Sequence, residues 1–357
     1  MTSVLHVITG LGPGGAETQL DQLASALHKS GMRQHVVSLR GRGTHADTLE
    51  EAGVAVTALG VKSAPTGAIG LLRLARLVRR LQPRVIHGWM YHGNAMAALT
   101  HRFARKGTRL MWNIRASNMD NARYGGIIRL NARLSRWPDV VVTNSHAALD
   151  LDCQHGFRPK CTVVIANGID TTRFCPDAAL RKAVRKELGL AEDVVVAIVV
   201  ARVDPMKDHE TFLKALSDLP DVQGLLVGAK TNELDLPANV RALGLRHDID
   251  RLLQAADLIV SSSAFGEGFS NALAEGMSSG LVPISTDVGD SGLIVGDTGH
   301  IVPPGDAQKL RDAIATETNL TRSQRRSRGL AARQRILDRF ALEQAVDAYA
   351  RLYGADG

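Results

Sequence analysis

Short apolar runs alternate with amphipathic segments along the whole chain of 357 residues. Amphipathic segments such as 16–31 and 70–83 place apolar residues at helical spacing, and Gly31 ends the first of them. The apolar runs have the length of strands, and they lie at 4–9, 34–39, 54–59, 84–89, 109–114, 140–145, 161–166, 194–201, 222–228, 239–244, 258–263 and 281–287. This order predicts the α/β class, with parallel sheets covered by helices on both faces.

The strand series restarts after a loop around 167–180, and the length of the chain favours two domains. We expect an N-terminal Rossmann-like domain over 1–170 and a C-terminal Rossmann-like domain over 171–340. A last helix within 341–357 has no strand after it, and we expect it to pack back on the N-terminal domain. Ligands of open parallel sheets bind beyond the carboxyl ends of the strands, so two such domains facing each other would form a central cleft.

Composition agrees with helix-covered parallel sheets and leaves the ligand open. Hydrophobic residues make up 45% of the chain and aromatic residues only 4%, so the cores should consist of Val, Leu, Ile and Ala. The chain has 43 Lys and Arg against 36 Asp and Glu, an excess of 7 positive charges. That balance permits an anionic ligand, an anionic membrane surface or nucleic acid, and a basic surface that serves solubility explains it equally well.

Nothing in the sequence indicates export, a membrane span or a metal site built on cysteine. Cys153, Cys161 and Cys175 have no metal-ligand spacing, which is typical of reduced thiols in a cytoplasmic protein. The N-terminus lacks the charged and apolar regions of a signal peptide. No window reaches the roughly 18 apolar residues of a membrane span. We therefore expect a cytoplasmic protein.

Two cations follow the first strand of the second domain. Arg202 comes directly after the run at 194–201, and Lys207 lies five residues further on. At the end of a strand both could reach one diphosphate, Arg as a planar fork and Lys as a mobile point charge. Taken alone, such a pair is more often two exposed loop cations.

The stretch 264–280 adds a glycine-flanked loop, a helix start and two carboxylates. Ser270 is a plausible N-cap, and free amides around Ser270, Asn271 and Ala272, after Gly268 and Phe269, would face an anion. Glu267 lies in the loop, and Glu275 follows it with seven residues between them, about one turn into the helix. Cations and amides for a diphosphate, with carboxylates for hydroxyls, favour a sugar joined to a nucleotide diphosphate. Ordinary surface glutamates near a glycine turn are the alternative.

The first domain has a glycine loop after its first strand. Residues 10–15 match a dinucleotide-binding fingerprint only loosely, because Pro13 interrupts it, and a lone glycine loop is weak support for a site. We interpret Gly14 and Gly15 as backbone contacts to the donor from across the cleft. Glu17, in the first turn of the next helix, complements the helix dipole.

Aromatic and histidine residues follow another strand of the first domain. Trp89, Tyr91 and His92 could line an acceptor pocket, since aromatic rings stack on sugars and histidine exchanges a proton near neutrality. Arg115, at the end of the next strand, could contact a phosphate of acceptor or donor. Structural roles explain all of these residues equally well.

Two further patterns are interpreted as structural. Asp248 and Asp250 match the short Asp-x-Asp pattern of metal-dependent sugar transferases, but they begin a predicted helix and two cations already cover the diphosphate. No metal is expected. The basic run 321–336 lacks interleaved aromatics, so it indicates a solvated helix face rather than a nucleic-acid partner.

These motifs together resemble the retaining GT-B glycosyltransferases of family 4. The resemblance rests on "GGAE" at 14–17, "ARVDPMKDH" at 201–209, "FGEGFSNALAEGMSSG" at 265–280, "STDVGD" at 285–290 and "GHIVPPGD" at 299–306. It spans nearly the whole chain and is more specific in the second domain. The chain is most similar to bacterial members that build surface polysaccharide or lipopolysaccharide.

The resemblance implies roles for the candidate residues. Arg202 and Lys207 would hold the diphosphate of a UDP- or GDP-sugar, with UDP favoured, Glu275 the ribose and Glu267 the hydroxyls of the transferred sugar. His92 falls where the family often has a histidine near that sugar, and it joins Glu267, Lys207 and Arg202 in the predicted catalytic set. The resemblance also implies transfer with retained anomeric configuration and without a metal or cofactor.

The acceptor and some alternatives stay open. A glycan or lipid-linked acceptor is expected, and the basic helices at 73–84 and 101–109 are candidates for peripheral contact with an anionic membrane on the inner face of the cell. A nucleotide-sugar epimerase or hydrolase on the same architecture is the first alternative. A non-catalytic donor-binding subunit is the second.

Overall fold

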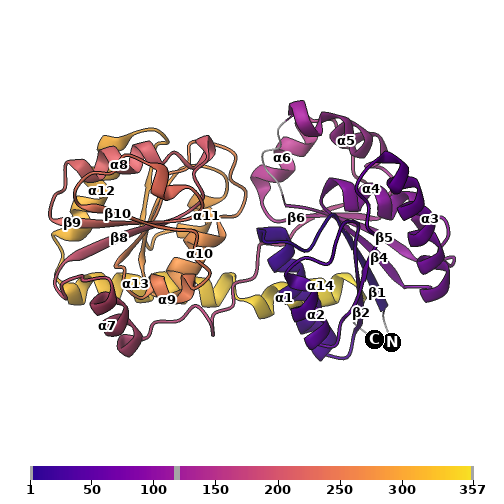
Figure 1. The fold of residues 1–357 in the computed structure, drawn as a ribbon, viewed down its shortest axis with the longest axis horizontal. Helices are drawn as coiled ribbons and strands as arrows, with labels where there is room; N and C mark the ends of the chain where they lie inside the picture. The colour runs from indigo at the N-terminus through magenta and orange to yellow at the C-terminus, as the bar shows by residue number, and fades with distance from the viewer. Residues whose placement is uncertain (1–2, 116–120, 355–357) are drawn as a thin grey trace. The chain divides into compact units, whose positions relative to one another are not determined.

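The computed structural model describes residues 3–115 and 121–354, and the chain forms two compact units. Unit 1 comprises Met1–Gly168 and Leu342–Gly357, and unit 2 comprises Ile169–Ala341. The expected boundary at 170 lies two residues from this division. The C-terminal helix α14 (Leu342–Leu352) belongs to unit 1, where Figure 1 shows it in yellow beside the indigo helices.

Unit 1 is built on a parallel sheet of seven strands in the order β3-β2-β1-β4-β5-β6-β7. The strands are β1 (Ser3–Ile8), β2 (Arg33–Ser38), β3 (Ala55–Ala58), β4 (Val85–Trp89), β5 (Arg109–Ile114), β6 (Val140–Thr143) and β7 (Thr162–Val164). The connecting helices are α1 (Gly15–Lys29), α2 (His45–Glu51), α3 (Ala64–Leu81), α4 (Met90–His101), α5 (Asn121–Leu134) and α6 (His146–Gln154). The strand order reverses between β1 and β4, which is the place where such sheets bind ligands.

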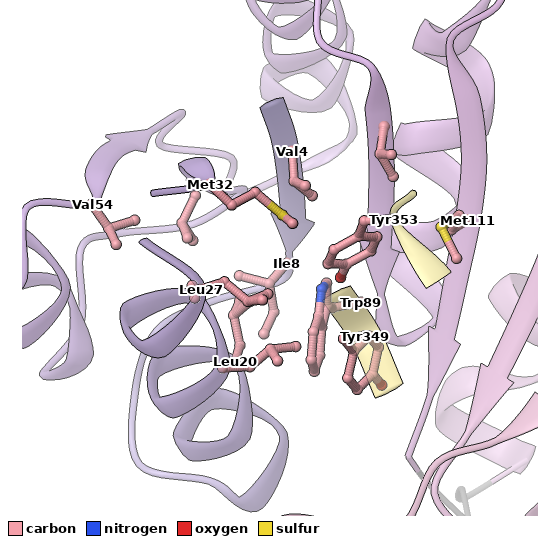
Figure 2. Close-up of a cluster of buried hydrophobic side chains, with 14 of the residues drawn as sticks. Val4, Ile8, Leu20, Leu27, Met32, Val54, Trp89, Met111, Tyr349 and Tyr353 are labelled. Carbon is pink, nitrogen blue, oxygen red and sulfur yellow. The ribbon is translucent and has the colours of Figure 1, made fainter. Parts of the chain in front are cut away.

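Both faces of this sheet are covered by apolar side chains, which is why its strands are continuous apolar runs in the sequence. One face packs against α1 and α14. Figure 2 shows Trp89 from β4 lying between the side chains of β1 and α1 and the rings of Tyr349 and Tyr353. Asn113 Nδ2 donates to the Tyr349 hydroxyl at 2.7 Å, so the C-terminal helix is tied to the sheet by polar as well as apolar contacts.

Unit 2 has a second parallel sheet of six strands in the order β10-β9-β8-β11-β12-β13. The strands are β8 (Val195–Val200), β9 (Val222–Val227), β10 (Val240–Gly244), β11 (Leu258–Ser261), β12 (Val282–Thr286) and β13 (His300–Val302). The helices are α7 (Ala178–Glu187), α8 (His209–Ser217), α9 (Ile249–Leu253), α10 (Asn271–Ser278), α11 (Ser291–Val295), α12 (Ala307–Thr318) and α13 (Arg322–Arg339), with short 3-10 turns η1 (Pro205–Lys207) and η2 (Thr231–Glu233). Here the order reverses between β8 and β11.

The two parallel sheets confirm the predicted α/β class and its pair of Rossmann-like domains. Each of the twelve predicted strands overlaps a strand of the structure, with ends that differ by a residue or two. The prediction missed β13, because three residues next to Pro303 are too short to form a recognisable run. Within the described residues, no helix is long and apolar enough to cross a bilayer.

The basic run at 321–336 is only in part the solvated helix face that the sequence suggested: Arg322 and Arg326 are exposed, but other arginines of the run are not. It forms most of α13, and several of its guanidinium groups bind main-chain carbonyls. Arg333 donates to Phe174 O at 2.9 Å, and Arg335 donates to Ile294 O at 2.8 Å. Arg325 is buried and donates to Leu320 O at 3.2 Å. Because a guanidinium has five donors, these side chains satisfy carbonyls at helix and loop ends in unit 2.

Candidate functional site

The carboxyl ends of β8 and β11 bring the main candidate residues of unit 2 together. β8 and β11 are neighbours at the reversal of strand order, and the loop after each strand leaves the sheet at the same edge. The β8 loop carries Lys207 and the β11 loop carries Glu267, sixty residues away in sequence. The two side chains form an ion pair with a hydrogen bond from Lys207 Nζ to Glu267 Oε1.

Local structure fixes the main chain of Lys207. Asp204 caps the 3-10 turn that ends at Lys207, and its carboxylate accepts from Met206 N at 3.0 Å. Pro205 is the first residue of that turn, where its fixed φ fits and its missing N–H is not needed. The hydroxyl of Ser262, just beyond β11, donates to Lys207 O at 3.0 Å. The cation is therefore anchored to both strand ends.

The Glu267 side chain is buried, and one of its two carboxylate oxygens accepts two hydrogen bonds. Its side chain is 8% exposed, and Oε1 receives the Ser263 hydroxyl at 2.7 Å in addition to the Lys207 ammonium. Removal of one member of a buried ion pair typically costs about 3–5 kcal/mol, whereas an exposed pair contributes little. The Lys207–Glu267 pair is thus largely shielded from solvent, with the Lys207 side chain 19% exposed. Beside it lies a cavity of about 20 Å³, lined in part by Lys207 and Ser270, with room for about one water molecule.

The helix predicted after the glycine loop is present as α10, with Ser270 at its N-cap. The Ser270 side chain makes no capping hydrogen bond, so it does not occupy an amide of the first turn. Gly276 allows the helix to lie close on β11, since a Cβ there would meet the Ile259 side chain at 2.6 Å. Phe269 packs its ring on Phe340 at 5.4 Å between centroids. The start of α10 is therefore held in place at the edge of the sheet that carries Lys207.

Glu275 is the fifth residue of α10, one turn in as predicted. Burial raises its pKa from 4.5 to about 7, the nearby Arg173 lowers it and Asp250 raises it further. Arg173 is itself paired with Asp250 at 2.9 Å, which limits how far it can stabilise a second carboxylate. Glu275 therefore changes its charge near neutral pH, unlike an ordinary surface glutamate.

Arg202 occupies a different position from Lys207. Its side chain is 61% exposed and its Nη2 lies 2.9 Å from Asp204 Oδ2. The structure brings it to the β8 loop but not into contact with Lys207 or Glu267. The contact of Arg202 with a diphosphate therefore stays a prediction.

In unit 1, the glycine loop and His92 lie after β1 and β4, the strands that flank the reversal. Gly14 is the N-cap of α1 and Gly15 its first residue, and the carboxylate of Glu17 lies over Gly14. Glu17 is in the first turn, as expected for a helix dipole, and burial raises its pKa. His92, on α4, is half-buried with its ring 6.4 Å from that of Tyr124. Burial, with Arg40 nearby, lowers the pKa of His92, so it is neutral at pH 7.

The proposed acceptor pocket of Trp89 and Tyr91 is wrong. Trp89 is 0% exposed and Tyr91 2%, so neither ring can line a pocket. Trp89 Nε1 donates to His6 Nδ1 at 3.0 Å inside the sheet, and Tyr91 packs on Phe157 at 6.1 Å between rings. The chain turns sharply at Met90, with φ of 60°, and enters α4 at once, so the rings on either side face the core.

Arg115 is held by unit 1 itself. It donates to the Tyr349 hydroxyl at 2.9 Å and to Asn113 Oδ1 at 3.1 Å, and it also hydrogen-bonds to Asn167. Its guanidinium lies 5.1 Å from the Trp89 ring. These contacts make Arg115 a bridge between β5 and the C-terminal helix. The contact of Arg115 with a phosphate stays a prediction.

The Asp-x-Asp pattern is accounted for by arginine partners. Asp248 accepts two hydrogen bonds from Arg246 at 2.8 and 2.7 Å, which lowers its pKa to about 2. Asp250 pairs with Arg173 on a different segment. The two carboxylates therefore serve separate ion pairs around the start of α9.

The sequence interpretation missed Ser262, Ser263 and Asp204. The serines were included in a predicted strand at 258–263, whereas β11 ends at Ser261. A run of serines where a buried apolar strand ends is a signal that could have identified them. Asp204 before Pro205 could similarly have been recognised as a cap.

Sequence comparison identifies two regions of the chain. The family described as Glycosyltransferase Family 4 matches residues 13–173, and the family described as Glycosyl transferases group 1 matches residues 194–317. A D-inositol 3-phosphate glycosyltransferase of Geodermatophilus obscurus is 29% identical over 229 residues, covering 56% of this chain and 50% of that protein. One from Mycobacterium tuberculosis is 27% identical over 232 residues, covering 60% and 48%. The chain spans about half the length of the curated relatives it matches.

Solved structures share the fold over almost the whole chain. Anabaena Alr3699/HepE in complex with UDP aligns with a TM-score of 0.86 at 22% identity, over 99% of this chain and 100% of that one. A sucrose-phosphate synthase from Thermosynechococcus elongatus aligns with a TM-score of 0.79 at 18% identity, over 99% and 98%. At these identities the likeness concerns the fold. With both of its domains matched by glycosyltransferase families, the chain belongs to the GT-B glycosyltransferases of family 4.

Proposed function

We propose that the chain transfers a sugar from a nucleotide-diphosphate donor, a UDP-sugar in preference to a GDP-sugar, to a glycan or lipid-linked acceptor. The transfer would retain the anomeric configuration, need no metal or other cofactor, and serve bacterial polysaccharide biosynthesis. The observation that carries the proposal is the Lys207–Glu267 pair, fixed by Ser263 at the reversal of strand order in unit 2. Such a reversal is where open α/β sheets bind ligands.

Lys207 supplies positive charge for the leaving diphosphate. Its ammonium has three N–H donors, of which one is directed at Glu267, and the others are available to phosphate oxygens. As the glycosidic bond breaks, negative charge builds on the diphosphate, and a preorganised cation stabilises it at little reorganisation cost. Arg202 and the first amides of α10, from Ser270 onward, would add to this stabilisation. Loss of one such group typically costs about 10²–10³ in rate.

The two carboxylates would act on hydroxyl groups. Glu267 has Oε2 free of the Ser263 and Lys207 hydrogen bonds, which both use Oε1, so it can accept from the transferred sugar. Glu275, when ionised, would accept from the ribose hydroxyls. His92 would lie near the sugar from unit 1, and because its pKa is lowered, it would act there as a neutral hydrogen-bonding group.

The preference for UDP and the choice of acceptors to test draw on the relatives. Structures of Anabaena HepE contain UDP and UDP-glucose. The curated relatives are named D-inositol 3-phosphate glycosyltransferases, although the chain matches only about half of their length. An acceptor screen should therefore include inositol phosphate beside glycan and lipid-linked acceptors.

Transfer assays with the full chain test the proposal. UDP-glucose, UDP-N-acetylglucosamine and GDP-mannose are each supplied with the acceptor panel, and the anomeric configuration of the product is read by NMR. Lys207→Ala should reduce turnover about 10²–10³-fold. Lys214→Ala is the matched control, because Lys214 forms an exposed ion pair with Glu210 on α8 and removes the same charge.

Each alternative predicts a different result in the same assay. Equal loss in Lys207→Ala and Lys214→Ala, or full activity in both, would contradict the assignment of the site. Free sugar or an epimer formed from donor alone would favour the hydrolase or epimerase. Donor binding without turnover on any acceptor would favour a non-catalytic subunit. Loss of transfer in EDTA would contradict metal independence.

We further propose that the protein works in the cytoplasm, peripherally attached to the inner face of the membrane. The exposed face of α3 carries Ile69 and Leu72, 51% and 58% exposed, at helical spacing from the exposed Arg73, Arg76 and Arg80. Apolar side chains flanked by arginines are suited to an anionic lipid surface. A lipid-linked acceptor would be presented at such a surface.

A further inference from the structure

We propose that unit 2 has a second ligand site, which takes an organic phosphate monoester with an apolar or aromatic body, at the amino edge of its sheet. The site is a cavity of about 460 Å³ between α7, the start of α13 and the loops before β11 and β12. That volume lies within the roughly 300–1,000 Å³ of small-molecule pockets. The proposal does not depend on the function proposed above.

The cavity is separate from the Lys207–Glu267 site. Asp257 and Leu281, which line it, directly precede β11 and β12, whereas Glu267 follows β11. In a parallel sheet, the residues before the strands and those after them lie at opposite edges. The cavity and the Lys207 site therefore lie at opposite edges of the unit 2 sheet.

The floor of the cavity is apolar and its rim is cationic. Leu253, Ala256 and Leu281 form buried parts of the lining. Lys182 on α7 and Arg326 on α13 stand exposed at the two walls. A ligand that pairs an apolar body with an anionic group matches this distribution.

Two of the three carboxylates of the lining, Asp257 and Asp177, already have partners, which leaves positive charge for a ligand. Asp257 is paired with Arg181 at 2.7 Å. Asp177 caps α7, and its carboxylate accepts from Ala179 N and Leu180 N at 2.9 Å each. The helix start is thus satisfied internally, and an anion here would be held by side chains rather than by free amides.

The cationic side chains that line the cavity differ in how many protein partners they have. Arg322 lies 3.5 Å from Glu192, and both side chains are more than half exposed, so this pair is weak. Among the described residues, the side chains of Lys182 and Arg326 make no hydrogen bond or ion pair. Phosphate suits this arrangement, since Arg binds it as a fork and Lys as a point charge.

Isothermal titration calorimetry on the full chain tests the proposal, with 1-naphthyl phosphate as the probe. We expect one saturable site. 1-Naphthol lacks the phosphate group and inorganic phosphate lacks the apolar body, so each should bind at least about tenfold more weakly than the probe. Lys182→Gln with Arg326→Gln should weaken binding of the probe by about tenfold or more. The matched control is Lys186→Gln with Arg339→Gln, which removes two exposed cations from the same two helices outside the cavity.

A second variant tests the cavity without changing charge. Ala178 lines the cavity at the exposed first residue of α7, so Ala178→Trp should fill the space and abolish binding while unit 2 stays folded. Equal weakening by the control pair, or unchanged binding in Ala178→Trp, would overturn the proposal. So would loss of probe binding in Lys207→Ala with retention in the Lys182 and Arg326 variant, because the probe would then occupy the site at the other edge.

Discussion

Substitution of Glu275 by Gln should stabilise unit 2 at high pH. In the folded protein, burial raises the pKa of this carboxyl from 4.5 to about 7. Between these two values the unfolded chain has lost the proton while the folded chain retains it, so the folded state binds more protons. Stability therefore falls as the pH rises through this window. Gln cannot ionise, and the variant escapes this loss.

The magnitude follows from the size of the pKa shift. Each pH unit inside the window costs about 1.4 kcal/mol, and the cost stops growing once the folded carboxyl is ionised. Between pH 5 and pH 8, the free energy of unfolding of Glu275→Gln relative to the unmodified protein should rise by about 2–3 kcal/mol. For a unit of this size the difference corresponds to roughly 5–10 °C in Tm.

Urea unfolding of both proteins at several pH values measures this difference directly, because all other titrating groups cancel. Glu210→Gln is the matched control: Glu210 is an exposed carboxylate of unit 2 whose pKa is lowered by Lys214, so its difference should stay nearly flat over the same range. A Glu275→Gln difference that does not change with pH would refute the reasoning. The same variant should bind the donor about tenfold or more weakly, since a charge-assisted hydrogen bond to ribose is lost.

Two further predictions concern unit 1. Burial lowers the pKa of His6 from 6.5 to about 4. Between these two pH values the unfolded chain binds a proton that the folded chain does not. The free energy of unfolding therefore falls by up to about 3 kcal/mol as the pH is lowered from 6.5 to 4. Acid titration followed by tryptophan fluorescence should show this loss, and an identical acid response in His6→Gln would contradict it. The chain should sediment with vesicles rich in phosphatidylglycerol but not with phosphatidylcholine vesicles. The double variant Ile69→Ser, Leu72→Ser should no longer sediment with the anionic vesicles, and equal sedimentation of this variant would contradict the membrane face on α3.

The strands could be predicted because parallel strands covered on both faces are continuous apolar runs, and such runs need no tertiary information. The exception, β13, is three residues long and carries too few side chains to form a pattern. The helix start at Ser270 was predictable for a similar reason, since glycines followed by a capping residue mark a local boundary. Its carboxylate at Glu275 followed from counting one turn onward.

Contacts and burial were not predictable in the same way. The residue types at Trp89 and Tyr91 suited an acceptor pocket, but one turn at Met90 directs both rings into the core. The arginines of α13 suggested a solvated helix face, yet Arg333 and Arg335 donate hydrogen bonds to main-chain carbonyls of segments far away in sequence. A side chain's environment depends on what packs over it, and the sequence pattern does not contain that information.

By itself, the sequence determined the class of the fold, the series of strands and helices, and the residue types available for binding a sugar nucleotide, because these follow from local periodicity and local chemistry. Only the tertiary structure decided which of those residues meet. It joined Lys207 to Glu267 across sixty residues and placed the Ser263 hydroxyl as a second donor to Glu267. The reason is physical: the order of strands in the sheet makes β8 and β11 neighbours, and that order is set by packing of the whole unit.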